Sequence, residues 1–438
     1  MTYFSSKQSS YQSTLVNLKY RPWIYAYYLL LLIIVACRTS EDAPNIVIRI
    51  GFLIAFFVPI VFKFRNLFPA CLISFMTVGT YGFAYNFFPY DMVMYVIIAA
   101  LGLMFTVGVK PFIPGKIFIF ILIYVLVVDL ANSQVVTTFS FSLATTMLMV
   151  LYMSKDKEFN ARLLLNCFCV SSLTLALIYL LNYEKFLFQY NHDGGELERS
   201  GWTDANYLSC IIGMGVITAL YLLLSTHNSK LWQKVFWIST LAIAFVSQVI
   251  MASRGGLLSV AASSVILIFM THAKIRYKVL ATLAIAAFVI WLFQNDYFEL
   301  MIYRIEHDDG TGSGRSEIWE DKLESFWLLN PIQLLFGVGY EKGNAMGGGG
   351  PLGFHNDFVA ILCEYGFIGL ILFLYILIRP LIGVRREERF PLIAFLVYIV
   401  ATCMTLEPFT AGRLTYFGFY LMIAVLANAN LKKPSRLL

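Results

Sequence analysis

Long apolar stretches separated by short polar segments dominate the chain. Most remain apolar over a whole window of about 19 residues, the length read as a membrane helix, whereas strands of a membrane barrel alternate over about ten residues. The pattern therefore predicts an all-α, polytopic transmembrane bundle of about 14 helices, with no internal repeat. The predicted spans are 23–38, 46–64, 67–86, 91–109, 116–131, 134–153, 161–183, 206–225, 232–251, 255–272, 279–294, 356–378, 390–406 and 414–430.

Composition supports the same class. Of 438 residues, 59% are apolar and 13% charged, against about 45–50% and 25% in soluble proteins. The chain has no room for a sizeable soluble domain. Its seven cysteines are odd in number and lie in or beside apolar runs, so neither a disulfide framework nor a zinc ribbon is expected. The polar opening residues 1–22 predict no cleavable signal peptide.

Charge placement predicts the orientation. With both termini cytoplasmic, the inner segments hold 22 of the 32 Lys and Arg residues, while 22 of the 26 acidic residues lie on the outer side. This distribution agrees with the positive-inside rule. The net charge of +6 therefore reflects topology, and nucleic acid is not an expected partner.

The spans and loops divide the chain into five segments. We expect N-terminal transmembrane helices over 1–183, a first outer-face loop over 184–205, and central transmembrane helices over 206–294. A large outer-face loop, 295–355, is the expected catalytic segment, followed by C-terminal transmembrane helices over 356–438. Because both long loops fall on the outer face, chemistry is expected there.

The large loop carries two recognisable patterns. Ile318, Trp319, Leu323, Phe326 and Trp327 recur at helical spacing among acidic residues, which predicts an amphipathic helix on the membrane surface, ending at Asn330 and Pro331. The glycine-rich remainder, LLFGVGYEKGNAMGGGGPLGFHND, is expected to be mobile. It is either a lid over a site or a plain flexible connector.

Four arginines stand at the ends of structured elements on the outer side: Arg199, Arg254, Arg315 and Arg413. Arg254 lies between two apolar runs with almost no loop, and charge within a membrane costs roughly 2.5–3.5 kcal/mol, so it is expected to be paired or functional. Guanidinium groups match phosphate oxygens in pairs, which makes a diphosphate the natural ligand. The alternative is that each arginine pairs with an outer carboxylate such as Glu407 or Glu364.

His355 and Asn356 stand at the head of a span, with Glu364 two turns further along. An imidazole can accept a hydroxyl proton near neutral pH, although a lone interfacial histidine is more often a plain boundary residue. The sequence contains no HExxH, no histidine pair at helical spacing and no DxD motif in the outer loops. A metal site is therefore not expected.

Three stretches resemble the O-antigen polymerase and ligase superfamily of membrane glycosyltransferases: ERSGWTDANYLSC, ASRGGLL and GRSEIW…LLFGVGYEKG…FHNDFVAILCEYGFIGLILFL. Their order and spacing cover about residues 196–375. The resemblance implies a GT-C-like fold in a bacterial inner membrane, an active site on the periplasmic face, and a glycan donor on undecaprenyl pyrophosphate. It also implies that no cofactor or metal is needed.

Carried over position by position, the resemblance implies site residues. Arg199 and Arg254 match the diphosphate arginines, joined by Arg413 through its outer location, while Arg315 matches the arginine of the large loop and His355 the catalytic histidine, with Glu364 or Asn356 orienting it. Substrate contacts are expected at Asn206 and Asn356. Trp202, Trp319 and Tyr340 are either glycan-stacking residues or interfacial anchors.

Three functions remain open. The preferred one is a Wzy-type polymerase that joins lipid-linked repeat units, with a chain-length regulator protein as a possible partner, because fourteen spans exceed the number typical of ligases. An O-antigen ligase would transfer the glycan to lipid A core instead. A flippase or transporter for lipid-linked sugars would carry ionisable residues near the bilayer midplane, and the predicted spans have almost none there.

Overall fold

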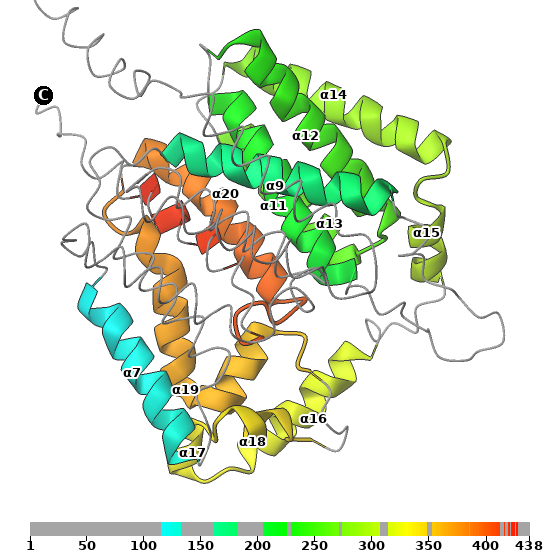
Figure 1. The fold of residues 1–438 in the computed structure, drawn as a ribbon. Coiled ribbons are helices and arrows are strands. Elements are labelled where there is room, and N and C mark those ends of the chain that lie inside the picture. The colour runs from blue at the N-terminus through cyan, green and yellow to red at the C-terminus, as the bar shows by residue number, and fades with distance from the viewer. Residues whose placement is uncertain are drawn as a thin grey trace, which may run out of the picture.

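The computed structural model describes residues 115–132, 161–181, 205–225, 229–270, 274–306, 314–347, 353–384, 386–411 and parts of 416–427, and all regular structure in these ranges is helical (Figure 1). The helices are α7 (Gly115–Ala131), α9 (Ala161–Leu181), α11 (Ala205–Ser225), α12 (Leu231–Ile250), α13 (Arg254–Met270), α14 (Ile275–Gln294), α15 (Glu299–Glu306), α16 (Arg315–Trp327), α17 (Pro331–Phe336), α18 (Tyr340–Asn344), α19 (Asp357–Ile378), the 3-10 turn η1 (Arg379–Leu381) and α20 (Arg386–Cys403).

The described helices include four that are long and apolar enough to cross a membrane: α11, α12, α14, and α19 together with η1. Shorter apolar helices occur in α7, α9, α13 and α20. The chain is thus a multi-pass membrane protein, and each of these eight helices coincides with a predicted span. The predicted spans 23–38, 46–64, 67–86, 91–109 and 134–153, and most of 414–430, lie outside the described residues, so the number fourteen stays a prediction.

Helix α11 forms the centre of the bundle, packed against α9, α12 and α13 and touching α20. Its surface is buried on nearly every side, which explains why its sequence is apolar all round rather than striped. Gly215 lies so close to Ser172 of α9 that a side chain there would collide with it. Small residues thus allow the close helix packing that membrane bundles favour.

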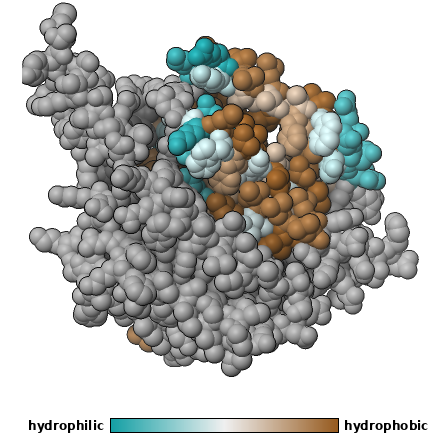
Figure 2. All heavy atoms as spheres, turned by 45° about the horizontal axis from the view of Figure 1, so that its top comes forward, coloured by the Kyte–Doolittle hydropathy of each residue, from teal (hydrophilic) through white to brown (hydrophobic). Residues whose placement is uncertain are grey.

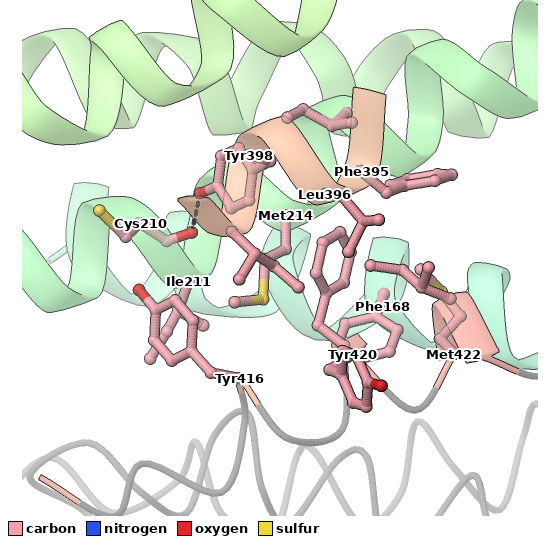
Figure 3. Packing of buried hydrophobic residues seen from close by; sticks show 14 of the residues in the cluster. Phe168, Cys210, Ile211, Met214, Phe395, Leu396, Tyr398, Tyr416, Tyr420 and Met422 are labelled. Atoms are coloured by element: carbon pink, nitrogen blue, oxygen red, sulfur yellow. Dashed lines mark hydrogen bonds between the residues drawn. The ribbon is translucent and has the colours of Figure 1, made fainter. Parts of the chain in front are cut away.

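Aromatic side chains from distant segments complete this core (Figure 3). The Tyr398 hydroxyl of α20 donates a hydrogen bond to the Cys210 carbonyl of α11. Phe419 packs edge-on against both Phe168 and Phe395, with ring centroids 5.4 and 5.5 Å apart. The core therefore joins α9, α11 and α20 with the C-terminal segment.

Helix α14 stands at the edge of the described bundle and exposes most of its side chains, including Val279, Leu283, Ile290 and Phe293. Figure 2 shows an apolar surface lying between hydrophilic edges on this side of the molecule. A band of this kind is expected where helices face lipid tails and their ends face water.

Helix α19 departs from the single continuous span that the sequence predicted. Gly366 adopts φ 65°, ψ −171°, which breaks the helix into a first half from Asp357 and a second half ending at Ile378; the two halves run in different directions (Figure 1). The break frees two carbonyls. The Glu364 carbonyl accepts from the Gly339 N–H at 2.9 Å, and the Tyr365 carbonyl accepts from the Tyr124 hydroxyl of α7 at 2.7 Å.

The described part of the glycine-rich stretch packs against this break. It includes the end of α17 and all of α18, and both helices pack on α19. The expected mobility of the stretch stays a prediction. Gly337 touches the Glu364 backbone so closely that no side chain would fit. Residues 348–352 of the stretch lie outside the described residues. The outer loop and the broken helix thus form one unit.

Candidate active site

The turn that follows α20, Thr405–Thr410, collects contacts from several distant segments, and we call it the hub turn. Asp357, at the start of α19, has the strongest attachment. Its backbone N–H donates to the Leu406 carbonyl at 3.1 Å. Its carboxylate is fully buried and accepts from the N–H groups of Phe409 and Thr410 and from the Thr410 hydroxyl, at 2.9–3.0 Å. These bonds fix the start of α19 on the hub turn.

The residues before Asp357 hold His355 in a defined position. Glu407 of the hub turn accepts a hydrogen bond from the Phe354 N–H at 3.1 Å. The Asn356 side chain caps α19, because its oxygen accepts from the Phe358 and Val359 N–H groups at 2.9 and 3.3 Å. Between them, half-buried His355 adopts φ 50°, a backbone region that few residues other than glycine occupy.

Asn356 was expected to contact substrate or to orient His355. In this structure its amide oxygen is engaged as a helix cap, and the substrate contact stays a prediction. Ncap asparagines satisfy N–H groups that otherwise lack partners. Asn356 therefore contributes to the site by holding its neighbour.

Helix α16 supplies two further side chains. Arg315, half-buried, donates from Nη1 to the Thr405 carbonyl at 2.9 Å. Trp319 donates from Nε1 to the Phe354 carbonyl at 2.7 Å. Part of the apolar side of α16 packs on the protein: Phe326 is fully buried and Ile318 and Leu323 are half-buried, whereas Trp327 is 61% exposed. The expected location of α16 on the membrane surface stays a prediction.

The helix starts that carry Arg254 and Asn206 also reach the hub turn. Arg254 begins α13 and is half-buried; the next residue, Gly255, lies so close to Thr405 that a Cβ there would stand 2.7 Å from its hydroxyl oxygen. Asn206 precedes Tyr207, whose hydroxyl oxygen accepts from the Glu407 N–H at 3.4 Å. The residues next to Arg254 and Asn206 thus both contact the hub turn.

Glu364 lies at the other end of the first half of α19, away from the hub turn. Its side chain is 1% exposed and packs beside Gly343 of α18. Among the described residues, its Oε2 has no hydrogen-bond partner, so the expected hydrogen bond that would orient His355 is absent there. Tyr340, the first residue of α18, is half-buried beside Gly339. Arg199, Trp202 and Arg413 lie outside the described residues.

Lys322 is a site residue that the sequence analysis missed. Its side chain is 3% exposed, its ammonium donates to the Asn344 carbonyl, and its Nζ lies 4.9 Å from the centre of the Phe354 ring. Burial lowers the pKa of this ammonium below its usual value, while Cys363, Glu407 and Glu364 act in the opposite direction. The sequence did contain a signal for Lys322: it falls on the apolar side of the predicted helix, opposite the carboxylates that are exposed in the structure.

The hub turn was also missed as a structural centre. Most of its contacts use backbone groups, and these leave no pattern in side-chain chemistry. The arrangement attaches Arg315 to this turn and places against it Gly255 and Phe354, the chain neighbours of Arg254 and His355. Such a group can bind an anionic ligand and move a proton. Among the described residues, no group of three or more His, Cys, Asp or Glu side chains is placed to hold a metal ion.

Comparison with known proteins assigns part of the chain. Residues 239–374 match the family model Wzy_C, described as O-antigen ligase. The match covers α13 to α18 and most of α12 and α19, and includes Arg254, Arg315 and His355; the hub turn lies beyond it. No curated protein matches the chain. Residues 239–374 are therefore a domain of the O-antigen ligase and polymerase family, as the resemblance predicted.

Proposed function

We propose that the protein is an integral-membrane glycosyltransferase that polymerises undecaprenyl pyrophosphate-linked oligosaccharides into O-antigen or a similar surface polysaccharide. One observation carries the proposal: Arg254, Arg315 and the His355 loop, all within the matched domain, are attached to or lie beside the same turn. A donor with an anionic leaving group needs this combination of cations and a base.

The arginines act on the leaving group. The donor sugar is bonded at its anomeric carbon to a lipid diphosphate, which leaves as a stable anion. Catalysis then consists mainly of stabilising the negative charge that grows in the transition state, and positively charged groups fixed in a poorly hydrated site do this well. Arg254 and Arg315 supply that charge, with Arg199 and Arg413 added from outside the described residues. No metal is required in this scheme.

His355 acts on the acceptor. As the acceptor hydroxyl attacks the anomeric carbon, the imidazole removes its proton, a step that contributes about 10²- to 10⁴-fold. Direct displacement predicts inversion at the anomeric carbon. Asn356 and Glu407 hold the loop that bears His355. Glu364 packs beside Gly343 of α18. Its role is therefore to hold α18 in position, and not to orient His355.

A ligase is the second candidate, favoured by the description of the matched family. The two enzymes differ in acceptor: a second lipid-linked repeat unit for the polymerase, and lipid A core for the ligase. We place the enzyme in a bacterial inner membrane, with both termini cytoplasmic and the site on the periplasmic face. The expected span count favours the polymerase.

Purified protein supplied only with lipid-linked repeat units tests the proposal. A polymerase produces a ladder of longer lipid-linked chains. Product that forms only after lipid A core is added identifies the ligase instead. His355→Ala should lower the rate of product formation about 10²- to 10⁴-fold, and Arg254→Ala should abolish product, while both variants accumulate normally in the membrane. Full activity in strong chelator is expected. Rescue of a chelated enzyme by Mg²⁺ would reject the metal-free scheme.

A further inference from the structure

One face of α16 is directed at the segment that carries His355. Arg315, Trp319, Lys322 and Phe326 follow one another at intervals of four, three and four residues, which places them on one side of a helix. Each is half-buried or buried, whereas Glu317, Glu320, Asp321 and Glu324 are exposed. The helix therefore presents its buried side to the site and its acidic side to the surroundings.

Phe354 is the main target of this face. Its carbonyl accepts from Trp319 Nε1 at 2.7 Å, and its ring lies under the Lys322 ammonium at 4.9 Å. Its N–H donates to Glu407 at 3.1 Å. With both backbone polar groups bonded and 1% of its surface exposed, Phe354 has a fixed position. It also shares a buried apolar cluster with Phe326.

The residue that follows Phe354 is His355, whose φ of 50° lies in the left-handed region. Positive φ is uncommon for residues other than glycine, although asparagine, aspartate and histidine adopt it more often than the rest, and surrounding contacts help to hold such a conformation. Asn356 is fixed on the far side as the cap of α19. The imidazole is therefore attached to a backbone held from both directions, and the upstream restraint comes from α16.

We infer that Trp319 and Lys322 are positioning residues for His355, acting through Phe354. The inference rests on the proposed function, since it gives His355 the part of the base. A base must lie within hydrogen-bond reach of the hydroxyl proton, and a misplacement of 1 Å can cost about 10²-fold in rate. Lys322 also donates to the Asn344 carbonyl of α18, so the same side chain joins the outer loop to the histidine loop.

This role differs measurably from glycan stacking by Trp319. Stacking uses the face of the indole, whereas positioning uses its N–H, which donates to Phe354. Trp319→Phe keeps an aromatic face and removes the donor. Because the ring face remains, stacking predicts little change in KM or kcat for Trp319→Phe. Positioning predicts a lower kcat at nearly constant KM, because transition-state geometry is lost while substrate contacts remain.

The experiment measures initial rates of chain elongation against donor concentration for Trp319→Phe and Lys322→Met. We expect kcat to fall about ten- to hundred-fold, with KM changed less than about two-fold. Lys322→Arg should recover most of the rate, because a guanidinium also donates to carbonyls and stacks on aromatic rings. Trp327→Phe and Lys342→Met are matched controls at exposed positions and should retain wild-type kcat.

A double variant tests the route of the effect. If Trp319 acts through His355, adding Trp319→Phe to His355→Ala should lower the residual rate by less than about two-fold, since the positioned group is already gone. An undiminished effect in the double variant would overturn the inference. If Trp319→Phe does not accumulate in the membrane, the comparison of Lys322→Met with Lys322→Arg tests the inference. A wild-type kcat in both variants would overturn the inference.

Different results would contradict the proposed function and the positioning role of Trp319 and Lys322. Wild-type turnover by His355→Ala would remove the histidine from the mechanism and so contradict the proposed function. A strongly lowered rate in His355→Ala together with wild-type kcat in Trp319→Phe and Lys322→Met would overturn the positioning role alone.

Discussion

At the scale of single residues, three consecutive residues, His355, Asn356 and Asp357, have three different roles. Asp357 binds the hub turn through a buried carboxylate that accepts three hydrogen bonds. Asn356 caps α19. Only His355 keeps a half-buried side chain at the site. A buried carboxylate is tolerated when hydrogen-bond donors satisfy its oxygens. Asp357 therefore has a structural role, which is to fix the start of α19, and no catalytic role is needed to explain it.

Lys322 allows a pH-dependent test of its burial. Its pKa is lowered in the folded protein, chiefly by loss of solvation. In the window between this lowered value and the usual value near 10.5, the unfolded chain binds more protons than the folded one, so the free energy of unfolding rises with pH. Relative to Lys322→Met, the wild type should therefore gain thermal stability as pH is raised toward 10.5.

Thermal unfolding in detergent between neutral pH and about pH 10.5 measures this difference, and other titrations cancel because both proteins share them. Lys342→Met, which removes an exposed lysine, controls for the loss of one positive charge. A stability gap between wild type and Lys322→Met that stays constant or moves the other way would contradict the burial of this ammonium.

At the scale of elements, the break in α19 links the outer loop to the membrane bundle. In the interior of a continuous helix, each carbonyl accepts a hydrogen bond from the N–H group four residues further along the same helix. Here the Glu364 and Tyr365 carbonyls bind Gly339 of the loop and Tyr124 of α7 instead. The second half of α19 therefore starts from a junction of three elements, and the position of the first half, which begins at the site, depends on this junction.

Gly366→Ala should destabilise this junction strongly. Gly366 has φ 65°, ψ −171°, and an added Cβ would stand 2.5 Å from the carbonyl carbon and oxygen of Leu335. Backbone strain and overpacking together should cost about 3 kcal/mol or more. Gly314→Ala is the control, because Gly314 has φ 76° with nothing within 4 Å of an added Cβ, which leaves strain alone, roughly 1–2 kcal/mol.

Thermal unfolding and membrane abundance distinguish the two variants. We expect Gly366→Ala to unfold well below Gly314→Ala and to lose elongation activity in proportion. Equal unfolding temperatures for both variants would show that the contact with Leu335 contributes nothing.

The sequence predicted elements better than their interruptions. Hydrophobic runs located α11 at 206–225 and α12 at 232–251, within one residue of the observed bounds Ala205–Ser225 and Leu231–Ile250, because lipid demands apolar side chains over the whole span. The break at Gly366 left no such signal, since its freed carbonyls are satisfied by distant backbone and hydroxyl groups.

The site also contains features that the sequence indicated and features that it did not. Arg254, Arg315 and His355 were predicted from residue type, location and the family resemblance, and their segments meet at one turn in the structure. Their roles in catalysis stay a prediction. Lys322 and the hub turn were missed because their contacts are to carbonyl oxygens and a ring, which any sequence can offer. Trp319 was found as an aromatic residue, but its hydrogen bond to Phe354 depends on tertiary packing.

At the scale of the whole molecule, four helix ends meet around the hub turn. Tyr207 near the start of α11, Gly255 at the start of α13 and Asp357 at the start of α19 all contact the segment that follows the end of α20. The opposite ends of these helices and of α12 and α14 carry basic residues, among them Lys230, Lys274 and Arg379. The basic residues thus stand at helix ends away from the hub turn, as expected for the extracytoplasmic active site that we propose.

Cysteine labelling tests this orientation. The described cysteines Cys167, Cys169, Cys210, Cys363 and Cys403 are all buried, and replacing Cys37 and Cys71 by serine leaves a protein with low background. Exposed single cysteines are then introduced on α16 by Glu320→Cys and next to α12 by Lys230→Cys. An extracytoplasmic site predicts that a membrane-impermeant maleimide modifies the first in intact spheroplasts and the second only after the membrane is opened. The reverse pattern would place the hub turn in the cytoplasm. Because undecaprenyl pyrophosphate-linked repeat units are proposed to be joined on the outer face, that result would remove the active site from its substrate and reject the proposed function.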